Sequence, residues 1–486
     1  MRIAVTTFFQ SQTNYGQLLQ AFALQQVLMR MGHYPYIIRY GFHEQLQPIL
    51  KFTFPTISFS KLLNKTRQGN VAEGSATDRH FDDFRRDHLN LSKNAYNHLE
   101  DLQLMPPIAD CYLTGSDQVW AQLLSCEDNR TFFLDFGPDG VYRLAYAPSF
   151  SLNAYPEVLR ERLSENLKRF NDISVREKTG VEICRNVGYD AQWVVDPTML
   201  LEGDDYRLLG QESHTTQPTN YMFVYHVNVG KKDFTCWPAF RDYNQQKGLT
   251  CIAVHANGEH QPDVEFLKDA EYVYPTIQDW IRWIDGSQYV LTTSFHGMIF
   301  AILLHKPFFI ILRPESQFAG NDRVTTILSE LNLSQRIVTP DMDVQRLMDK
   351  PIDWETVDKK LQTLRKHSIA FLDKNLSKVQ ILADDQHTFF WIQSLTEKWI
   401  SLKEALSQDN AALNHQIQTL QQNNLQLQEQ CAIQQSQLST LEEKAAALNR
   451  DKSYLTRKRK KYLTIVRWLS LVIALLIVSL VLSIFK

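Results

Sequence analysis

Residues 2–25 read RIAVTTFFQSQTNYGQLLQAFALQ, and their pattern indicates the fold class. Its apolar start predicts a buried strand, and the turn Asn14-Tyr15-Gly16 leads directly into a helical pattern that Gly32 closes. A strand, a turn with glycine and a helix form the first half of a βα unit. Because a helix start leaves backbone N–H groups unpaired, it attracts anions. Asn14 and Gly16 therefore either bring this helix end to a ligand, or Asn14 only caps the helix through its side chain.

Strand and helix patterns go on alternating through the chain, which is typical of parallel sheets covered by helices. The further strand-like runs are YPYIIRY (34–40), ADCYLTG (109–115), YRLAYAPSF (142–150), NYMFVYHV (220–227), LTCIAVHA (249–256), SQYVLTTS (287–294) and KPFFIIL (306–312). We therefore expect two doubly wound α/β domains, residues 1–195 and 196–395, with the chemistry in the loops that follow the strands.

The composition indicates a folded protein with more than one domain, since the 486 residues exceed a single core and 44% of them are hydrophobic. A net charge of -3 provides no basic field, so nucleic acid is not expected as a partner. The six cysteines lie far apart without a C-x-x-C pair, which argues against a zinc site or a disulfide framework and favours a reduced compartment. The N-terminus turns polar too early for a signal peptide.

The C-terminal stretch is strongly apolar. WLSLVIALLIVSLVLSIF, residues 468–485, carries no charge, and RKRKK precedes it at residues 457–461. Basic residues collect on the cytoplasmic side of membrane segments. The pattern predicts one transmembrane helix at residues 462–485, which would anchor the protein in the cytoplasmic membrane with its catalytic part in the cytoplasm.

Residues 400–456 are rich in glutamine and predict a coiled coil. Apolar residues recur there at alternating steps of three and four, from Leu413 and Ile417 to Leu455. Asn424 takes an a position of this heptad pattern, and a buried asparagine there favours a parallel pair of helices. We expect a parallel homodimer; a disordered glutamine-rich tether is the alternative.

The strongest candidate for chemistry is the loop within LTTSFHG, residues 291–297. Ser294 and two threonines offer hydrogen-bond donors beside His296, whose imidazole is of the type that titrates near neutral pH. A single histidine is more often a packed or capping residue. The position of His296 between a strand end and a helix start favours a role in chemistry instead.

Two other loops carry candidate residues. In GSDQVW, residues 115–120, Gly115 lets the backbone approach a ligand, and Asp117 either acts on an acceptor hydroxyl or caps a helix. In ISVREKTG, residues 173–180, Arg176 and Glu177 follow an apolar triplet, and a surface ion pair is the default expectation for them.

Taken together, eight segments resemble the polysaccharide pyruvyl transferase family, and they occur in the family's order. The resemblance covers roughly residues 1–385 and does not extend to the coiled coil or the C-terminal stretch. The segments are NYGQLLQAFALQ, GSDQVW, YAPSF, SVREKTG, VVDPTMLL, TTSFHGMIFAILLHKPFF, NDRVTTILSELNLSQRI and IDWETVDKKLQTLRKHSIAFL.

The resemblance implies two Rossmann-like domains in a GT-B-like arrangement, with the active site between them. It implies phosphoenolpyruvate as the donor substrate and no cofactor or metal. The three-carbon unit of the donor would pass to two hydroxyls of a sugar as a ketal, with release of phosphate. The acceptor would be a sugar or lipid-linked oligosaccharide of a surface-polysaccharide precursor.

The resemblance also assigns roles to single residues. His296 would be the general acid toward the methylene carbon, and Asp117 a base toward the acceptor. Arg176 would hold the donor's carboxylate or phosphate. The remaining matched positions would bind substrate: Asn14, Gly16, Gly115, Ser116, Ser294, Arg313, Asn321 and Arg323.

One position departs from the family pattern. Some members carry Arg-Leu-His where this chain has Ser294-Phe295-His296. Either Arg313 or Arg323 substitutes for the missing cation, or the donor differs. Two other functions stay open: a GT-B-type glycosyltransferase that uses a nucleotide sugar, which the lack of a G-x-G-x-x-G motif disfavours, and a non-catalytic membrane scaffold for polysaccharide assembly.

Overall fold

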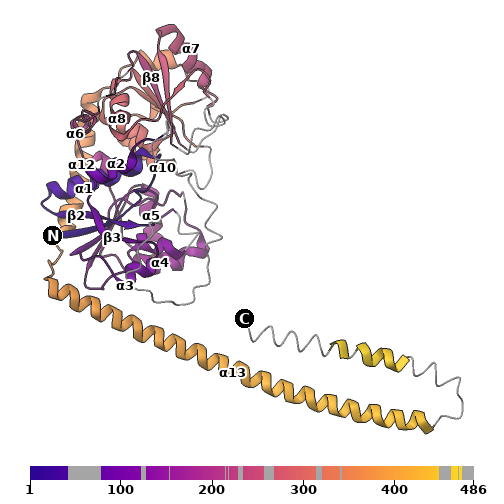
Figure 1. Cartoon of the computed structure of the whole chain (residues 1–486). Coiled ribbons are helices and arrows are strands. Elements are labelled where there is room, and N and C mark those ends of the chain that lie inside the picture. The colour runs from indigo at the N-terminus through magenta and orange to yellow at the C-terminus, as the bar shows by residue number, and fades with distance from the viewer. Residues whose placement is uncertain are drawn as a thin grey trace. The chain divides into compact units, whose positions relative to one another are not determined.

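The computed structural model divides the chain into two units, Met1–Thr396 and Glu397–Lys486 (Figure 1). The structure describes residues 1–41, 78–121, 127–152, 154–213, 215–216, 218–227, 234–256, 267–313, 320–339, 342–447, 461–468 and 470–472. The first unit holds two parallel sheets with their helices, and the second unit is helical where it is described.

The first sheet has seven parallel strands in the order β3-β2-β1-β4-β5-β6-β7. This order reverses direction between β1 and β4, as in a Rossmann fold, and ligands of such sheets bind beyond the strand ends at this switch point. The strands are β1 (Arg2–Thr6), β2 (Tyr34–Tyr40), β3 (Leu91–Tyr96), β4 (Cys111–Thr114), β5 (Tyr142–Ala145), β6 (Asp172–Val175) and β7 (Gln192–Trp193). The helices of this half are α1 (Tyr15–Arg30), α2 (Phe81–His88), α3 (Leu99–Leu104), η2 (Glu127–Phe133), η3 (Glu157–Leu159), α4 (Arg160–Leu167) and α5 (Lys178–Asn186).

The second sheet has five parallel strands in the order β10-β9-β8-β11-β12, so its direction reverses between β8 and β11. The strands are β8 (Tyr221–His226), β9 (Thr250–His255), β10 (Glu271–Tyr272), β11 (Tyr289–Thr292) and β12 (Phe308–Ile310). The helices that precede, flank or follow this sheet are η4 (Pro197–Met199), α6 (Gly203–Gly210), α7 (Trp237–Lys247), α8 (Ile277–Gly286), α9 (Phe295–Leu303), α10 (Asp322–Glu330), η6 (Ser334–Arg336), α11 (Val344–Met348) and α12 (Trp354–Leu376).

The predicted pair of Rossmann-like α/β halves is confirmed by these two strand orders. Every strand-like run named from the sequence contains a strand of the structure. Four further strands escaped the sequence pattern, namely β3, β6, β7 and β10. Two of them are only two residues long, and β3 reads LSKNAY, which is too polar to predict a buried strand.

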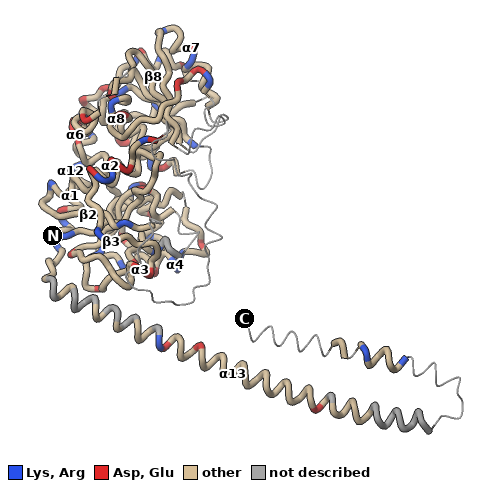
Figure 2. The backbone as a smooth tube through the Cα atoms, in the orientation of Figure 1, with Lys and Arg blue, Asp and Glu red and all other residues tan. Residues whose placement is uncertain are grey.

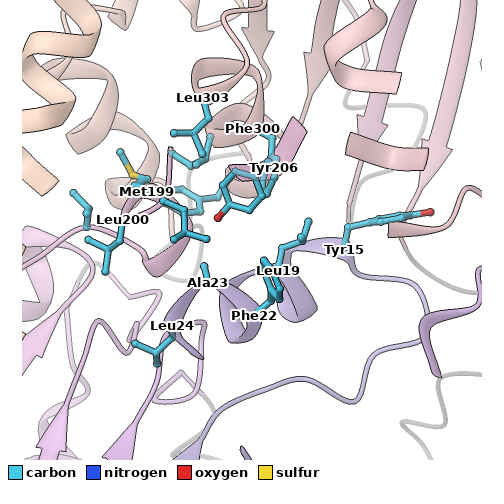
Figure 3. Packing of buried hydrophobic residues seen from close by; sticks show 14 of the residues in the cluster. Tyr15, Leu19, Phe22, Ala23, Leu24, Met199, Leu200, Tyr206, Phe300 and Leu303 are labelled. Atoms are coloured by element: carbon cyan, nitrogen blue, oxygen red, sulfur yellow. The ribbon is translucent and has the colours of Figure 1, made fainter. Parts of the chain in front are cut away.

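A continuous apolar core joins the two halves, and α1 lies at its centre (Figure 3). Leu19 and Ala23 of α1 belong to the same buried cluster as Met199 and Phe300 from the other side. Tyr15 at the start of α1 donates a 2.6 Å hydrogen bond to the carbonyl of Pro275 and stacks on Trp280 at a centroid distance of 5.0 Å. Burial on both sides explains why Arg30 is the one charged residue of α1, and it fixes the N-terminus of α1 against the second half.

The long helix α13 (Asp384–Ala447) has 64 residues. Charged residues are sparse along its described part (Figure 2), and residues 410–428 contain none. Large apolar side chains such as Leu413, Ile417 and Leu427 are about half exposed in the single chain. The helical state predicted for this stretch is therefore present as far as Ala447, and residues 448–456 lie outside the described residues.

The predicted membrane anchor is contradicted. Among the residues that the structure describes, no helix combines the length and the apolar character needed to cross a bilayer. Residues 469 and 473–485 of the predicted span lie outside the described residues. The single-pass helix and the membrane localisation inferred from it are corrected accordingly.

Candidate functional site

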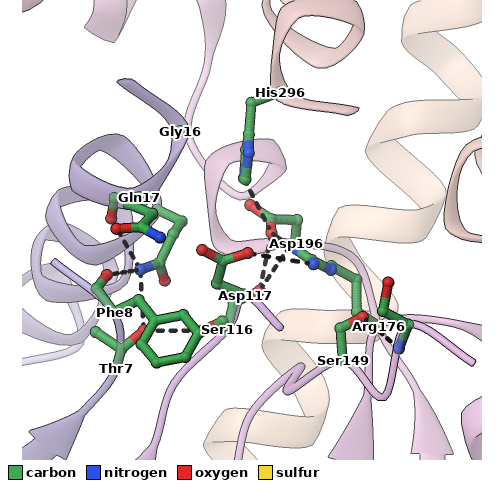
Figure 4. A network of polar contacts seen from close by, with 12 residues as sticks. Thr7, Phe8, Gly16, Gln17, Ser116, Asp117, Ser149, Arg176, Asp196 and His296 are labelled. Atoms are coloured by element: carbon green, nitrogen blue, oxygen red, sulfur yellow. Dashed lines mark hydrogen bonds and ion pairs between the residues drawn. The ribbon is translucent and has the colours of Figure 1, made fainter. Parts of the chain in front are cut away.

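The loops that follow the switch-point strands of both sheets meet between the two halves. Gly16, in the first turn of α1, lies against His296, in the first turn of α9 (Figure 4). A Cβ atom built on Gly16 would lie 2.1 Å from Nδ1 of His296, so this position accepts only glycine without a shift of the ring. The structure therefore gives Gly16 a steric role: it leaves the space that the imidazole occupies.

Gly16→Ala is expected to displace the His296 ring and to lower activity by 10-fold or more, because misplacement of a reacting group by about 1 Å can cost about 100-fold. Stability should change much less, since alanine favours the helix. Steady-state kinetics and thermal unfolding of the same variant would separate the two effects. Gly210→Ala is the matched control, because the new Cβ would lie 3.0 Å from the flexible side chain of Arg282 and at ordinary contact distances, 3.5 and 3.7 Å, from Ile281 and Gln278. Equal activity of both variants would contradict the steric role.

Asp196 is the centre of the polar network between the halves (Figure 4). It lies on the crossing from the first sheet to the second and is completely buried. Its Oδ2 accepts a 2.8 Å hydrogen bond from Ser116 Oγ and another of 2.8 Å from Nη1 of Arg176. His296 Nε2 lies 3.5 Å from the same Oδ2. One carboxylate oxygen therefore contacts residues from both halves.

Arg176 follows β6 and is buried rather than on the surface. Burial alone would lower the pKa of Arg176, but the carboxylates of Asp196 and Asp117 overcome this effect and raise it. Nε and Nη2 make no hydrogen bond to any residue that the structure describes, although Nη2 lies 3.6 Å from Asp117. Arg176 is thus a buried positive charge whose Nε and Nη2 can still donate hydrogen bonds. An anionic ligand binds to such a group.

The expected surface ion pair of Arg176 with Glu177 is wrong. Glu177 is also buried, with 2% of its surface exposed, and its Oε1 accepts from the backbone N–H groups of Phe150 and Ser151. Burial raises the pKa of Glu177 against the opposing effect of Arg176. The side chain thus fixes the loop after β5, and Arg176 pairs with Asp196 instead.

The candidate site has a second buried guanidinium, that of Arg323 on α10. The ring of Phe295 is 5.0 Å from the Arg176 guanidinium carbon and 5.8 Å from that of Arg323. Burial, together with the charges of Arg176 and Arg313, lowers the pKa of Arg323 to about 9. With the amide oxygen of Gln118 turned toward Arg323, this oxygen accepts hydrogen bonds from the Arg323 guanidinium. Nε of Arg323 makes no hydrogen bond to any described residue. An anion placed here would relieve the repulsion among these cations.

The loop after β4 supplies further predicted residues. Asp117 has a left-handed backbone with φ of 77°, and its carbonyl accepts a 2.8 Å hydrogen bond from Ser149 N–H, which points the residue into the network. Ser116 is held by Asp196 through its hydroxyl, as described above, and by Thr7 through its carbonyl. Gly115 packs closely on Thr7, where a Cβ would lie 3.1 Å from the Thr7 Cβ. This loop is therefore tightly fixed to β1 and to Asp196.

Three of the predicted binding residues hold local structure. Asn14 caps α1, since its side chain accepts from Gly16 N–H at 3.1 Å, and Ser294 caps α9 by accepting from Gly297 N–H at 3.3 Å. Asn321 uses both ends of its amide on the backbone of Arg313. Capping and loop fixation thus account for these side chains, and they position His296 and the loop of Arg313.

Sequence reasoning missed the role of Asp196 and of Phe295. Asp196 was seen only as the start of the second half, in VVDPTMLL. A signal was present, because a carboxylate directly after a buried strand-like run and before Pro-Thr is placed at a strand end, where ligand-binding residues collect. Phe295 gave no such signal, since a phenylalanine in an apolar helix reads as core.

Three solved structures illustrate what the chain is similar to. The UDP-GlcNAc 2-epimerase from Neisseria meningitidis bound to UDP-GlcNAc has a TM-score of 0.41 at 9% identity, covering 78% of this chain and 100% of that one. The UDP-N-acetylglucosamine 2-epimerase from Rickettsia bellii scores 0.44 at 10%, covering 78% and 97%. An alpha-glucosyltransferase in complex with UDP and a 13-mer DNA scores 0.41 at 10%, covering 78% and 100%. These scores are too low to assign a fold or a ligand.

Unlike these structures, a family profile matches the sequence of the chain and shows its family. No curated protein matches the chain. The profile of the family described as polysaccharide pyruvyl transferase matches residues 14–314, which include Gly16, Arg176, Asp196 and His296 and span more than half of the chain. The chain therefore belongs to the polysaccharide pyruvyl transferase family and is an enzyme of the transferase class.

Proposed function

We propose that this protein transfers the three-carbon unit of phosphoenolpyruvate to two hydroxyls of a sugar as a pyruvyl ketal. The observation that carries the proposal is the pair of buried guanidiniums, Arg176 and Arg323, on the ring of Phe295, next to His296. A donor with a carboxylate and a phosphate needs two cationic partners and one proton source. Family membership supports the same reaction class.

The two arginines bind the two anionic groups of the donor. Arg176 offers Nε and Nη2, which no described residue accepts from, and Arg323 offers Nε. The cation missing at Ser294 is supplied by Arg323, which faces the same phenylalanine from α10. Arg313 has the secondary role of adding positive potential near Arg323, and its backbone is held by hydrogen bonds with the side chain of Asn321.

His296 delivers a proton from Nε2 to the methylene carbon of the donor, which becomes a methyl group and leaves positive charge on the adjacent carbon. A sugar hydroxyl bonds to that carbon and gives its proton to Asp117. The bond from the carbon to the phosphate oxygen breaks, and the phosphate departs with the proton that Asp117 took from the first hydroxyl, which returns Asp117 to its carboxylate form. The second hydroxyl then closes the ketal, and its proton returns to the imidazole, so the enzyme ends as it began.

Phosphate release tests this proposal. The full chain is incubated with phosphoenolpyruvate and a panel of sugars that carry neighbouring or 4,6-related hydroxyls, and phosphate is measured with and without each sugar. The proposal predicts release that requires both the donor and one acceptor. Release that does not depend on any acceptor, or transfer from a nucleotide sugar in its place, would contradict it.

For the helix α13 we propose a parallel homodimer. A second copy fits because positions e and g of the heptads between residues 414 and 437 are all Asn or Gln, so identical chains in register meet no like charges. The half-exposed Leu413, Ile417 and Leu427 lie on the seam, and pairing would remove them from water. Asn424 lies at an a position between them and selects two strands.

Asn424→Leu is expected to strengthen association and to relax the preference for two strands, since the buried amide costs stability but specifies the pair. Sedimentation equilibrium of the full chain should change from a dimer to a mixture of dimers and larger oligomers. Asn423→Leu, one residue away at a g position, is the matched control and should leave the dimer unchanged. A monomeric parent protein at micromolar concentration would contradict the proposed pair.

A further inference from the structure

We propose that Asp196 is a positioning residue that holds Arg176 and the His296 ring in one fixed relation across the two halves. The inference rests on the proposed function, because it assigns these two partners to donor binding and proton delivery. Asp196 itself need not touch the donor. Its contribution is to keep the proton donor and the anion-binding cation aligned, which is how enzymes convert a bound substrate into a reactive one.

The two oxygens of the Asp196 carboxylate have different roles: Oδ1 holds the side chain in place, and Oδ2 contacts the functional residues. Oδ1 is anchored locally, because it accepts from Thr198 N–H at 3.0 Å and from Thr198 Oγ1 at 2.7 Å. Oδ2 is left for Ser116, Arg176 and His296, at 2.8, 2.8 and 3.5 Å. With Oδ1 fixed, the plane of the carboxylate cannot rotate, and Oδ2 therefore sets where both functional side chains lie.

The backbone that carries Asp196 is itself held from several directions. Val195 N–H donates to Ser368 Oγ of α12 at 3.0 Å, and Tyr206 donates from its hydroxyl to the carbonyl of Thr198 at 2.9 Å. Arg365 of α12 donates to the carbonyls of Met199 and Leu201, both at 2.9 Å. The carboxylate is thus built into a rigid crossing between the halves rather than onto a loose loop.

The charge of Asp196 is permanent. Burial would raise the pKa of this carboxyl, but His296 and Arg176 overcome that effect and hold its pKa far below the usual range. A carboxylate that stays deprotonated beside the anion-binding cation competes with an incoming anionic donor for Arg176. The arrangement therefore favours alignment at some cost in donor affinity. Removal of the Asp196 charge should therefore lower turnover without weakening donor binding, whereas loss of a purely structural residue would weaken both.

Asp196→Asn is the test, since asparagine keeps the shape and the acceptor oxygen for Thr198 but removes the charge. Turnover with phosphoenolpyruvate and an acceptor should fall about 100-fold, because proton donor and cation lose their common anchor. The dissociation constant of phosphoenolpyruvate, measured by calorimetry on the full chain, should stay equal or become smaller. Weaker donor binding together with the lost turnover would overturn the inference, because general loss of site structure weakens both.

Thr198→Val keeps the charge of Asp196 and removes one of the two donors to Oδ1, so it tests the inference if the first variant does not fold. We expect a loss of turnover of about 10-fold with unchanged donor affinity, and unchanged turnover would overturn the inference. Failure of the proposed function is distinguishable. In that case the parent protein itself would not bind phosphoenolpyruvate in the calorimeter, whereas failure of this inference leaves parent binding intact and changes only the variants.

Discussion

Replacing His296 by glutamine is expected to lower the rate of phosphate release by about 100- to 10,000-fold, the usual contribution of a positioned acid, while donor affinity changes little. The reason is the position of the ring. Its Nε2 faces the network of Asp196, and that nitrogen makes no hydrogen bond to any described residue. Glutamine can fill the space and donate a hydrogen bond, but it cannot deliver a proton to carbon.

The measurement combines phosphate release with calorimetry of donor binding. His387→Gln is the matched control, because His387 is also buried beside a carboxylate, with Nε2 3.3 Å from Asp110, but it lies at the start of α13 and away from His296. That variant should retain activity even if it loses stability. Comparable turnover in the parent protein and in His296→Gln would remove His296 from the mechanism.

Arg176→Lys is expected to weaken phosphoenolpyruvate binding by about 100-fold, which corresponds to roughly 3 kcal/mol from lost charge-assisted hydrogen bonds in a buried site. Lysine retains the charge, and so Asp196 keeps a cationic neighbour. However, an ammonium group cannot pair with Asp196 and present a planar fork to the donor at the same time. The dissociation constant of the donor is the direct readout, and turnover at saturating donor should recover in part.

Arg143→Lys is a suitable control for the destabilisation that loss of any buried arginine causes. Arg143 is also buried, but among the described residues its guanidinium donates only to backbone carbonyls, including those of Leu134 and Phe136 at 3.2 and 2.8 Å. This variant should unfold at a lower temperature and bind the donor normally. If both variants lost stability and neither lost donor affinity, Arg176 would be a structural residue only.

Much of the fold could be predicted because buried parallel strands are nearly continuous apolar runs. RIAVTTFF, NYMFVYHV and KPFFIIL stand out against their surroundings, and each contains a strand of the structure. The strand order could not be read from these runs. It depends on which helix crosses which face, and only the folded chain shows that both sheets reverse direction next to the loops of Gly16 and His296.

The candidate site was predictable only where a residue sits directly after a strand. His296 and Asp117 were found in this way, and the structure places both within contact of the network around Asp196 and Arg176. The surface ion pair expected by default for Arg176 and Glu177 is wrong, because burial by the loop after β5 is a tertiary effect. Donor binding by Arg176, which the family resemblance implies, stays a prediction. The steric role of Gly16 likewise depends on a ring 280 positions further along the chain.

The membrane span predicted at the C-terminus is contradicted, unlike the strands. The uncharged residues 468–485 and the basic RKRKK before them predicted a transmembrane helix. Among the described residues, no helix has the length and the apolar character needed to cross a bilayer.

In the proposed reaction, His296 between the two halves protonates the methylene carbon of an anionic three-carbon donor. Running the reaction in D₂O and recording the NMR spectrum of the sugar product tests this step. Since the proton on His296 exchanges with solvent, we expect a pyruvyl ketal whose methyl group carries one deuterium. A product without a ketal, or a ketal whose methyl group contains no deuterium, would contradict it.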